Sequence, residues 1–189
     1  MTKLDKKNLR GIYSKKRLEM SNSDFLKKSE QICKKVLALP QISTKKNFST
    51  YLPTNNEVDT KILIDDLIAQ AKTVLVPCYF KRSKDYHFSK FTNWHQLEKG
   101  PFGILQPKNP KIVDSSGIEI AILPGLAFSK DGVRLGYGKG VFDKLLSITN
   151  ALKISLAYDF QIIDEIPREE HDLLMDLIVT EKTIYKMKR

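Results

Sequence analysis

Cysteine is scarce in this sequence and is not arranged for chemistry. Cys33 and Cys78 are the two cysteines among 189 residues, and they form neither a Cys-x-x-Cys pair nor a Cys/His pattern with metal-ligand spacing. Two isolated cysteines in a chain without a signal sequence are most simply interpreted as buried thiols. Their scarcity argues against a cysteine-based metal site and against thiol catalysis.

Long apolar runs and low-complexity segments are also absent. No apolar run approaches the ~20 residues that span a bilayer, and the N-terminus is charged from Lys3 without the apolar segment of a secretion signal. No repeat, linker or composition break divides the chain, whose length suffices for a buried core. We therefore expect one domain over residues 1–189, located in the cytoplasm and without a membrane partner.

Negative charge is in the minority. The chain has 32 Lys and Arg against 22 Asp and Glu, and residues 1–35 hold +7 of the net charge of +10. A cluster of cations on one face is typical of phosphate-backbone binding to nucleic acid. Lys-rich helices also serve solubility alone, and attraction of ATP is a third use. The charge by itself leaves these interpretations open.

The sequence does contain a glycine-rich segment, GVRLGYGKGVFD, at residues 132–143. It follows a buried apolar stretch, IEIAILPGLAF (118–128), and precedes a helical pattern that begins at Val141. Glycines let the backbone approach an anion closely, and a helix N-terminus favours negative charge. The segment therefore predicts a phosphate-binding loop.

Three charged side chains of this segment support that prediction. Arg134 and Lys139 would neutralise phosphate charge, and Asp143 offers a carboxylate for Mg2+. Two familiar patterns fail, because Gly140 stands where a P-loop has Ser or Thr and Val141 stands where a dinucleotide fingerprint has its third glycine. A flexible surface hairpin is the alternative for a loop this rich in glycine.

Apolar periodicity alternates between helix and strand along the chain. We expect helices over 4–20, from about Asp24 to a stop at Pro40, over 59–71 and from Val141, and strands over 47–52, 73–78, 118–124, 153–158 and 177–180. Residues 79–116 are polar and rich in turn residues, which predicts a loop with 87–91 as a candidate strand. In such an α/β layer fold, ligands bind at loops after strand C-termini, so segments 52–57 and 124–140 should share one side of the sheet.

The segment PGLAFSKDGVRLGYGKGVFDKLL (124–146) resembles the signature of the 5-formyltetrahydrofolate cyclo-ligase family, also called methenyltetrahydrofolate synthetases. Further segments resemble that family in the same order: KKNLR (6–10), YLPTNNEVDT (51–60), GPFGILQP (100–107) and QIIDEIPREEHD (161–172). The resemblance covers most of the chain. It implies an α/β fold in one compact domain, with a Rossmann-like, mostly parallel central sheet flanked by helices.

The resemblance also implies a reaction. Members of the family use ATP and Mg2+ to convert 5-formyltetrahydrofolate into 5,10-methenyltetrahydrofolate, with release of ADP and phosphate. The γ-phosphoryl group of ATP would activate the formyl oxygen, N10 would attack, and phosphate would leave. The expected partners are 5-formyltetrahydrofolate, with or without a polyglutamate tail, and ATP as co-substrate, bound by a monomer that does not act on nucleic acid.

Residue roles follow from the positions that match the family pattern. The residues expected to bind the nucleotide are Lys6, Arg10, Arg134, Leu135, Gly136, Tyr137, Gly138, Lys139, Gly140, Val141 and Phe142, with Arg134 and Lys139 acting in catalysis. The residues expected to bind the folate are Leu52, Glu57, Phe102, Tyr137, Gly138, Lys139, Gly140 and Val141. The expected Mg2+ ligands are Asp143 and Asp172. Taken singly, these residue types more often serve as surface charge, helix caps or core.

The sequence departs from the family pattern at two places. Val141 and Phe142 stand where the family most often has a Tyr-Tyr pair, so both hydroxyls are missing, and Gln106 stands where many members have Glu. Two rival hypotheses are a non-catalytic relative that keeps the fold and a nucleic-acid-binding module that uses the basic N-terminal face; a different ATP-dependent ligase is a weaker alternative. The first two leave unexplained why the expected site residues are all present in order.

Overall fold

The computed structural model describes residues 5–169 and 172–187, except for the side chain of Phe102. Its α-helices are α1 (Lys6–Leu18), α2 (Asn22–Leu37), α3 (Pro40–Thr44), α4 (Lys61–Ala69) and α5 (Val141–Leu145). The strands of the large sheet are β1 (Asn47–Ser49), β2 (Thr73–Phe80), β3 (Asp85–Lys90), β6 (Ile120–Leu123), β9 (Leu152–Leu156), β11 (Leu177–Val179) and β12 (Ile184–Lys186). The shorter elements are β4 (Leu97–Lys99), β5 (Leu105–Pro107), β7 (Ala127–Ser129), β8 (Arg134–Leu135), β10 (Ile162–Ile163), and the 3-10 turns η1 (Trp94–Gln96), η2 (Pro101–Gly103) and η3 (Asp159–Gln161).

The large sheet has the strand order β12-β11-β9-β6-β1-β2-β3. The strands from β11 to β2 run parallel, and the two edge strands, β12 and β3, run antiparallel to their neighbours. Parallel strands that are covered on both faces favour apolar residues, as the fully buried sequence IAIL of β6 illustrates. The predicted α/β fold with a mostly parallel central sheet is confirmed.

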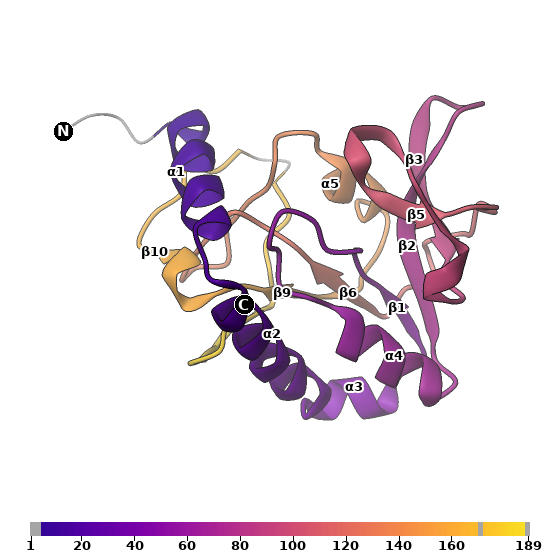
Figure 1. Ribbon diagram of the computed structural model, residues 1–189, viewed down its shortest axis with the longest axis horizontal. Coiled ribbons are helices and arrows are strands. Elements are labelled where there is room, and N and C mark those ends of the chain that lie inside the picture. Colours follow the sequence, from indigo (N-terminus) through magenta and orange to yellow (C-terminus); the bar gives the residue numbers. More distant parts are fainter. Residues whose placement is uncertain (1–4, 170–171, 188–189) are drawn as a thin grey trace.

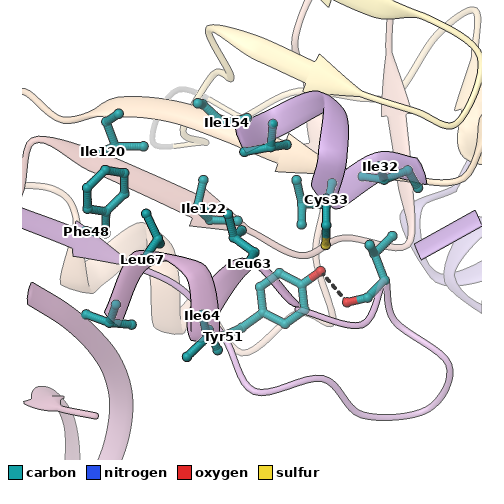
Figure 2. Close-up of a cluster of buried hydrophobic side chains, with 14 of the residues drawn as sticks. Ile32, Cys33, Phe48, Tyr51, Leu63, Ile64, Leu67, Ile120, Ile122 and Ile154 are labelled. Carbon is teal, nitrogen blue, oxygen red and sulfur yellow. Dashed lines mark hydrogen bonds between the residues drawn. The ribbon is translucent and has the colours of Figure 1, made fainter. Parts of the chain in front are cut away.

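Successive residues of β6 supply the two hydrophobic cores on opposite faces of the sheet. Ile120 and Ile122 belong to the core that contains the apolar sides of α2 and α4, part of which is drawn in Figure 2. Ala121 and Leu123 belong to the other core, which contains Leu146 at the end of α5. In Figure 1, α2, α3 and α4 form a row along one side of the molecule, while α1 and α5 lie on the opposite side.

Helix α1 packs away from these two cores, on a small sheet formed by β10, β7 and β8. Its Leu9 lies in a third apolar cluster with Ala127 of β7 and Leu135 of β8. Strand β8, the antiparallel partner of β7, lies near the start of the glycine-rich segment, so this packing places α1 directly beside the predicted phosphate loop. Polar residues of α1 near Leu9 are thereby brought beside this loop.

The ends of α2 differ from the sequence prediction at Pro40. The helix begins at Asn22, where the Ser21 hydroxyl oxygen accepts a hydrogen bond from the backbone N–H of Asp24 at 3.1 Å. It ends at Leu37, before the proline, and Pro40 is instead the first residue of α3. Proline suits this position because its missing N–H would have no partner in a first helical turn.

The middle of the chain contains more strand than the predicted loop over 79–116. Strand β2 extends to Phe80 and forms a hairpin with β3, which pairs Leu75 with Lys90 and Phe80 with Asp85. A second hairpin, β4–β5, follows it. The polar composition of this region reflects strands at the edge of the molecule, where one face of each strand is in contact with solvent.

Candidate functional site

A cavity of about 920 Å3 lies where the loops after β1 and β6 meet. Its walls come from α1, the loop after β1, the β2–β3 hairpin, the glycine-rich segment and the residues around Asp172. The expected site residues that line it are Lys6, Arg10, Leu52, Glu57, Arg134, Leu135, Gly136, Tyr137, Gly138, Lys139, Gly140, Val141, Phe142, Asp143 and Asp172. The expected contact of Phe102 lies outside the described residues, although Ile104 and Leu105 of the same segment line the cavity. Segments far apart in the sequence therefore converge as expected from the strand order, and their ligand roles remain predictions.

Two glycines of the loop allow α1 and the loop to come close together. Gly138 has φ of +84°, and a Cβ placed on it would lie 3.2 Å from the guanidinium carbon of Arg10. A Cβ at Gly136 would lie 2.9 Å from Nη1 of Arg134. The Arg10 side chain uses this space to donate a hydrogen bond from Nε to the carbonyl oxygen of Gly136 at 2.9 Å. Glycine at these positions leaves room for the side chains of Arg10 and Arg134 against the loop.

Arg134 is the buried cation of the loop, with 9% of the residue exposed. Its Nη2 donates to both carboxylate oxygens of Asp143, at 2.9 and 3.0 Å, and its Nη1 donates to the carbonyl oxygen of Pro124 at 3.3 Å. Its Nε is buried without a hydrogen-bond partner among the described residues. A buried donor without a partner costs free energy because it has lost its hydrogen bonds to water. An anionic ligand that reoriented the Arg134 side chain could supply the missing partner.

Asp172 is held by α1 rather than exposed to solvent. Its Oδ2 accepts hydrogen bonds from Lys6 Nζ and from the backbone N–H of Glu169, both at 2.8 Å, and Lys6 also donates to Glu169 Oε1 at 2.8 Å. Desolvation lowers the pKa of Lys6, but the hydrogen bonds to Asp172 and Glu169 outweigh it and raise the pKa above its ordinary value. Lys6 therefore carries its positive charge at the cavity wall throughout the neutral pH range.

The donor set suits a magnesium ion that is bound together with phosphate. No group of three or more His, Cys, Asp and Glu within 5–169 and 172–187 is arranged to hold a metal. Mg2+ is usually held in phosphate-transfer sites by one or two carboxylates, with water and phosphate oxygens completing its shell. Asp143 and Asp172, which both line the cavity, are hard oxygen donors of that kind.

Glu57 is the buried carboxylate of the site, with 5% of the residue exposed. Its Oε2 accepts from the backbone N–H of Thr54 at 3.0 Å, and its Oε1 accepts from the hydroxyl of Tyr137 at 2.9 Å. Burial raises the pKa of Glu57, while Arg17, the Thr54 N–H and the Tyr137 hydroxyl act to lower it. Burial, followed by the charge of Glu57, also raises the pKa of Tyr137, which keeps its hydroxyl protonated as a donor.

Arg17 was missed by the sequence analysis, although it is among the most buried charged residues, with 1% exposed. It donates from Nε to the carbonyl oxygen of Asn55 at 2.7 Å and from Nη2 to the Tyr137 hydroxyl oxygen. Its Nη1 lies 4.0 Å from Glu57 Oε1. A signal was present in the sequence, because Arg17 follows Lys6 by eleven residues, about three helical turns, and so shares its helix face.

The two departures from the family pattern occupy different environments. The ring of Phe142 packs against both hydrophobic cores, so its main contact is apolar and needs no hydroxyl. Gln106 is buried outside the cavity lining, where its Oε1 accepts from the backbone N–H of Tyr79 at 3.0 Å and its Nε2 donates to Glu98 at 3.2 Å. The amide thus joins the β4–β5 hairpin to β2 and has no direct part in the cavity.

Comparisons with known proteins agree with these observations. A profile of the 5-formyltetrahydrofolate cyclo-ligase family matches residues 2–181. The 5-formyltetrahydrofolate cyclo-ligase of Mus musculus is 30% identical over 189 aligned residues, which cover 93% of this chain and 93% of the mouse protein. The corresponding protein of Mycoplasma genitalium is 31% identical over 179 residues, covering 93% of this chain and 98% of its own. The solved structure of the 5,10-methenyltetrahydrofolate synthetase of Aquifex aeolicus is 29% identical, superposes with a TM-score of 0.85 and covers 97% of this chain and 93% of that chain.

None of the helices within 5–169 and 172–187 combines the length and the apolar character that crossing a membrane requires.

Proposed function

Because the chain belongs to the 5-formyltetrahydrofolate cyclo-ligase family, we propose that it converts 5-formyltetrahydrofolate into 5,10-methenyltetrahydrofolate with ATP and Mg2+, releasing ADP and phosphate. The observation that carries this proposal is the contact between Tyr137 and Glu57, at 2.9 Å. Tyr137 belongs to the loop proposed to hold phosphate, and Glu57 is the carboxylate proposed to recognise the pterin ring. Phosphoryl transfer to a group on that ring requires the two sites to be adjacent.

The chemistry consists of two displacements. The oxygen of the formyl group on N5 attacks the γ-phosphorus of ATP. This step forms an O–P bond and releases ADP. The electron pair of N10 then attacks the formyl carbon, the C–O bond breaks, and the oxygen leaves with the phosphate as N10 loses its proton. Such phosphoryl transfer depends mainly on positioning and on stabilisation of charge, so no protein nucleophile is needed.

Arg134 and Lys139 are the cations proposed to stabilise this charge. Both line the cavity, one buried in β8 and the other exposed on the loop. When phosphate binds, Arg134 can exchange one or both of its bonds to Asp143 for bonds to phosphate oxygens, which gains a partner for its unsatisfied Nε. The same exchange releases the carboxylate of Asp143 for the metal.

Asp143 and Asp172 are the residues proposed to hold Mg2+. The ion would supply charge neutralisation at the phosphate oxygens. On the protein side, Lys6 donates to Asp172 and Arg134 donates to Asp143, so each carboxylate is already oriented by a cation that lines the cavity. These two cations are also proposed to contact the nucleotide.

Glu57 and the apolar wall are proposed to bind the folate. With two oxygens, Glu57 can accept hydrogen bonds from the ring N–H and the exocyclic amine of a pterin. Leu52, Pro77 and Tyr86 line the same cavity and offer apolar surface to the flat ring.

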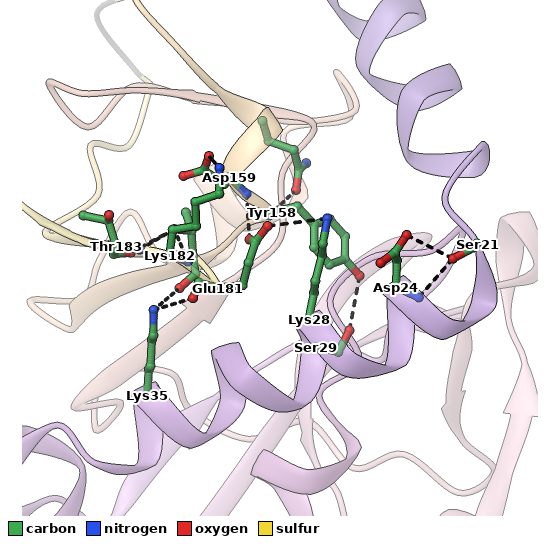
Figure 3. A network of polar contacts seen from close by, with 12 residues as sticks. Ser21, Asp24, Lys28, Ser29, Lys35, Tyr158, Asp159, Glu181, Lys182 and Thr183 are labelled. Atoms are coloured by element: carbon green, nitrogen blue, oxygen red, sulfur yellow. Dashed lines mark hydrogen bonds and ion pairs between the residues drawn. The ribbon is translucent and has the colours of Figure 1, made fainter.

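The basic N-terminal region does not need a nucleic-acid partner to explain it. Lys6 and Arg10 face the cavity, Arg17 is buried, and Lys35 donates to the carbonyl oxygens of Thr180 and Glu181 at 3.1 and 2.6 Å. Figure 3 shows Lys35 and Lys28 directed toward the chain after β11. Much of this charge therefore has an internal role, which favours the enzyme over the binding module.

The test is the growth of near-ultraviolet absorbance from the methenyl product when the protein is mixed with 5-formyltetrahydrofolate, ATP and Mg2+. We expect product only with ATP, and a loss of about a hundredfold in kcat/KM for Lys139→Ala, since a charge that stabilises the transferring phosphoryl group is removed. Lys130→Ala is the matched control, because Lys130 is an exposed loop lysine that pairs with Asp164 outside the cavity. Absence of product from folded wild-type protein that binds folate would contradict the proposal.

A further inference from the structure

We propose that Arg17 is a positioning residue for folate recognition: it holds the Tyr137 hydroxyl and the Glu57 carboxylate as one unit, so that the folate site and the phosphate loop are assembled together. This inference rests on the proposed function, because it takes Glu57 as the group that recognises the folate. Arg17 itself does not line the cavity, so it acts through its two neighbours.

The hydrogen-bond directions determine what Arg17 does to Tyr137. The guanidinium can only donate, so the Tyr137 hydroxyl oxygen accepts from Nη2 and must send its own proton elsewhere. The acceptor it finds is Glu57 Oε1, at 2.9 Å. Arg17 thus fixes the polarity of the chain of hydrogen bonds and directs the phenol proton toward the carboxylate.

The backbone contacts of Arg17 determine where the unit sits. Nε donates to the carbonyl oxygen of Asn55 in the loop after β1, and Nη1 donates to the carbonyl oxygen of Gly125 in the turn after β6, at 2.7 and 3.4 Å. In return, Asn56 Nδ2 donates to the Arg17 carbonyl oxygen at 3.2 Å. One planar group therefore touches three walls of the site, which a lysine ammonium on a flexible stem cannot reproduce.

Charge is the second contribution of Arg17. The described groups that face Glu57 are Arg17 from α1, Tyr137 from the glycine-rich loop, and Tyr51 and the Thr54 N–H from the segment after β1. Arg17 is the cation of this set. Without it, burial would raise the pKa of Glu57 further, and a protonated carboxyl could no longer accept two hydrogen bonds from the folate.

A purely structural role makes a different prediction, and Lys35 provides the comparison. Lys35 also ties a helix to backbone carbonyl oxygens, those of Thr180 and Glu181, but none of these residues lines the cavity. A variant at Lys35 should therefore lose stability without any change in ligand recognition. Lys35→Met is the matched control for Arg17→Met.

The experiment measures binding of 5-formyltetrahydrofolate and of a non-hydrolysable ATP analogue by calorimetry, from mildly acidic to mildly basic pH, for the full chain and its variants. We expect Arg17→Met to weaken folate binding at neutral pH by about thirtyfold or more, the usual effect of truncating one partner of a buried charge pair, with a smaller effect on the nucleotide. Folate binding by the wild type should fall as the pH drops through the pKa of Glu57. In Arg17→Met this fall should occur at higher pH, so the loss should shrink as pH rises.

Two further variants keep the proposal testable if Arg17→Met does not fold. Arg17→Lys keeps the charge but not the fork, so we expect weaker folate binding with the wild-type pH profile. Tyr137→Phe removes the bridging hydroxyl and should weaken folate binding by about tenfold, the worth of one hydrogen bond to a charged group. In Arg17→Lys/Tyr137→Phe, the two losses should combine to less than their product, because both act through Glu57.

The outcomes separate this proposal from the proposed function. Equal losses for folate and nucleotide at every pH, or folate binding by Arg17→Met like that of Lys35→Met, would overturn the role of Arg17 while leaving the enzyme intact. Wild-type protein that binds folate but forms no methenyl product would overturn the proposed function, and the shifted pH profile of Arg17→Met would still support Arg17 as the residue that prepares Glu57.

Discussion

Two charged networks join a helix to the ends of the sheet, and they differ in almost everything except their chemistry. In the first, which we call the Arg17 cluster, Arg17 of α1 contacts Tyr137 and Glu57, and Arg17 and Glu57 are 1% and 5% exposed. In the second, the α2 clasp of Figure 3, Lys28 and Lys35 contact the turn between β11 and β12, and Lys182 of that turn pairs with Asp159. The Arg17 cluster borders the cavity and the clasp does not.

This difference teaches that burial of the cation beside the cavity, rather than the number of ion pairs, separates a functional network from a supporting one. In the clasp, the side chains of Lys28 and Lys182 are 30% and 70% exposed, so water can replace a lysine that is lost and each lysine contact affects only local stability. In the Arg17 cluster, loss of one partner leaves the others buried without compensation. The cluster should therefore respond as a unit, and the clasp as a set of separate contacts.

The largest expected effect is that of Glu57→Gln in the Arg17 cluster. The neutral amide cannot offer two acceptor oxygens to the folate, and it leaves Arg17 buried without its carboxylate, so we expect kcat/KM for methenyl formation to fall by about a hundredfold or more. In the clasp, Glu181→Gln makes the same chemical change in a side chain that is 9% exposed but lies outside the cavity, so it touches no reacting group and we expect kcat/KM within about threefold of the wild type. Comparable losses in the two variants, with folding confirmed by circular dichroism, would remove the distinction between the networks.

A smaller effect concerns the pH dependence of stability. Burial raises the pKa of Glu57, so the folded protein binds this proton more tightly than the unfolded chain. The stabilisation that results is complete below the ordinary pKa of a glutamate and is lost as pH rises through the raised value. Glu57→Gln should remove this loss, so the urea midpoint of the wild type should fall relative to that of the variant across this window.

Glu119 provides the opposite control for that measurement. Its carboxylate accepts from the backbone N–H groups of Lys46 and Asn47, at 2.8 and 3.0 Å, and these bonds lower its pKa. Its contribution is therefore present above the ordinary pKa of a glutamate and is lost as pH falls through the lowered value. The difference in urea midpoint between the wild type and Glu119→Gln should therefore shrink as the pH falls through this window. If the difference between wild type and variant changed with pH in the same direction for Glu119→Gln and Glu57→Gln, the assigned causes would be contradicted.

The contrast between the networks also explains how much of the site could be predicted from the sequence. The glycine-rich loop could be located because its chemistry is carried by one short segment, and the alternating pattern was enough to put this loop and the segment 52–57 at strand ends. The family resemblance then singled out Glu57 and supplied the expected roles. The α/β layer fold followed from alternating helical patterns and buried runs such as the IAIL of β6, and the mostly parallel sheet was implied by the family resemblance.

Arg17 could not be found in this way, because its contacts are long-range. Its partners Asn55, Gly125 and Tyr137 lie 38, 108 and 120 residues further along the chain. In the sequence around it, Arg17 is one more cation on a Lys-rich helix. The extent of β3 was predicted too short for a related reason. Its strand character depends on pairing with β2 rather than on an apolar pattern of its own.

The smallest expected effect is that of Lys182→Ala in the α2 clasp. The Lys182 Nζ lies 2.8 Å from Asp159 Oδ2, a separation equal to that between Lys6 Nζ and Asp172 Oδ2. The Lys182 side chain is 70% exposed, however, whereas that of Lys6 is 18% exposed. Solvent screening and side-chain entropy offset an exposed pair, so we expect no measurable change in the urea midpoint or in kcat/KM. A clear loss of stability would show that distance alone ranks these contacts, and burial would then not explain why the Arg17 cluster and the clasp differ.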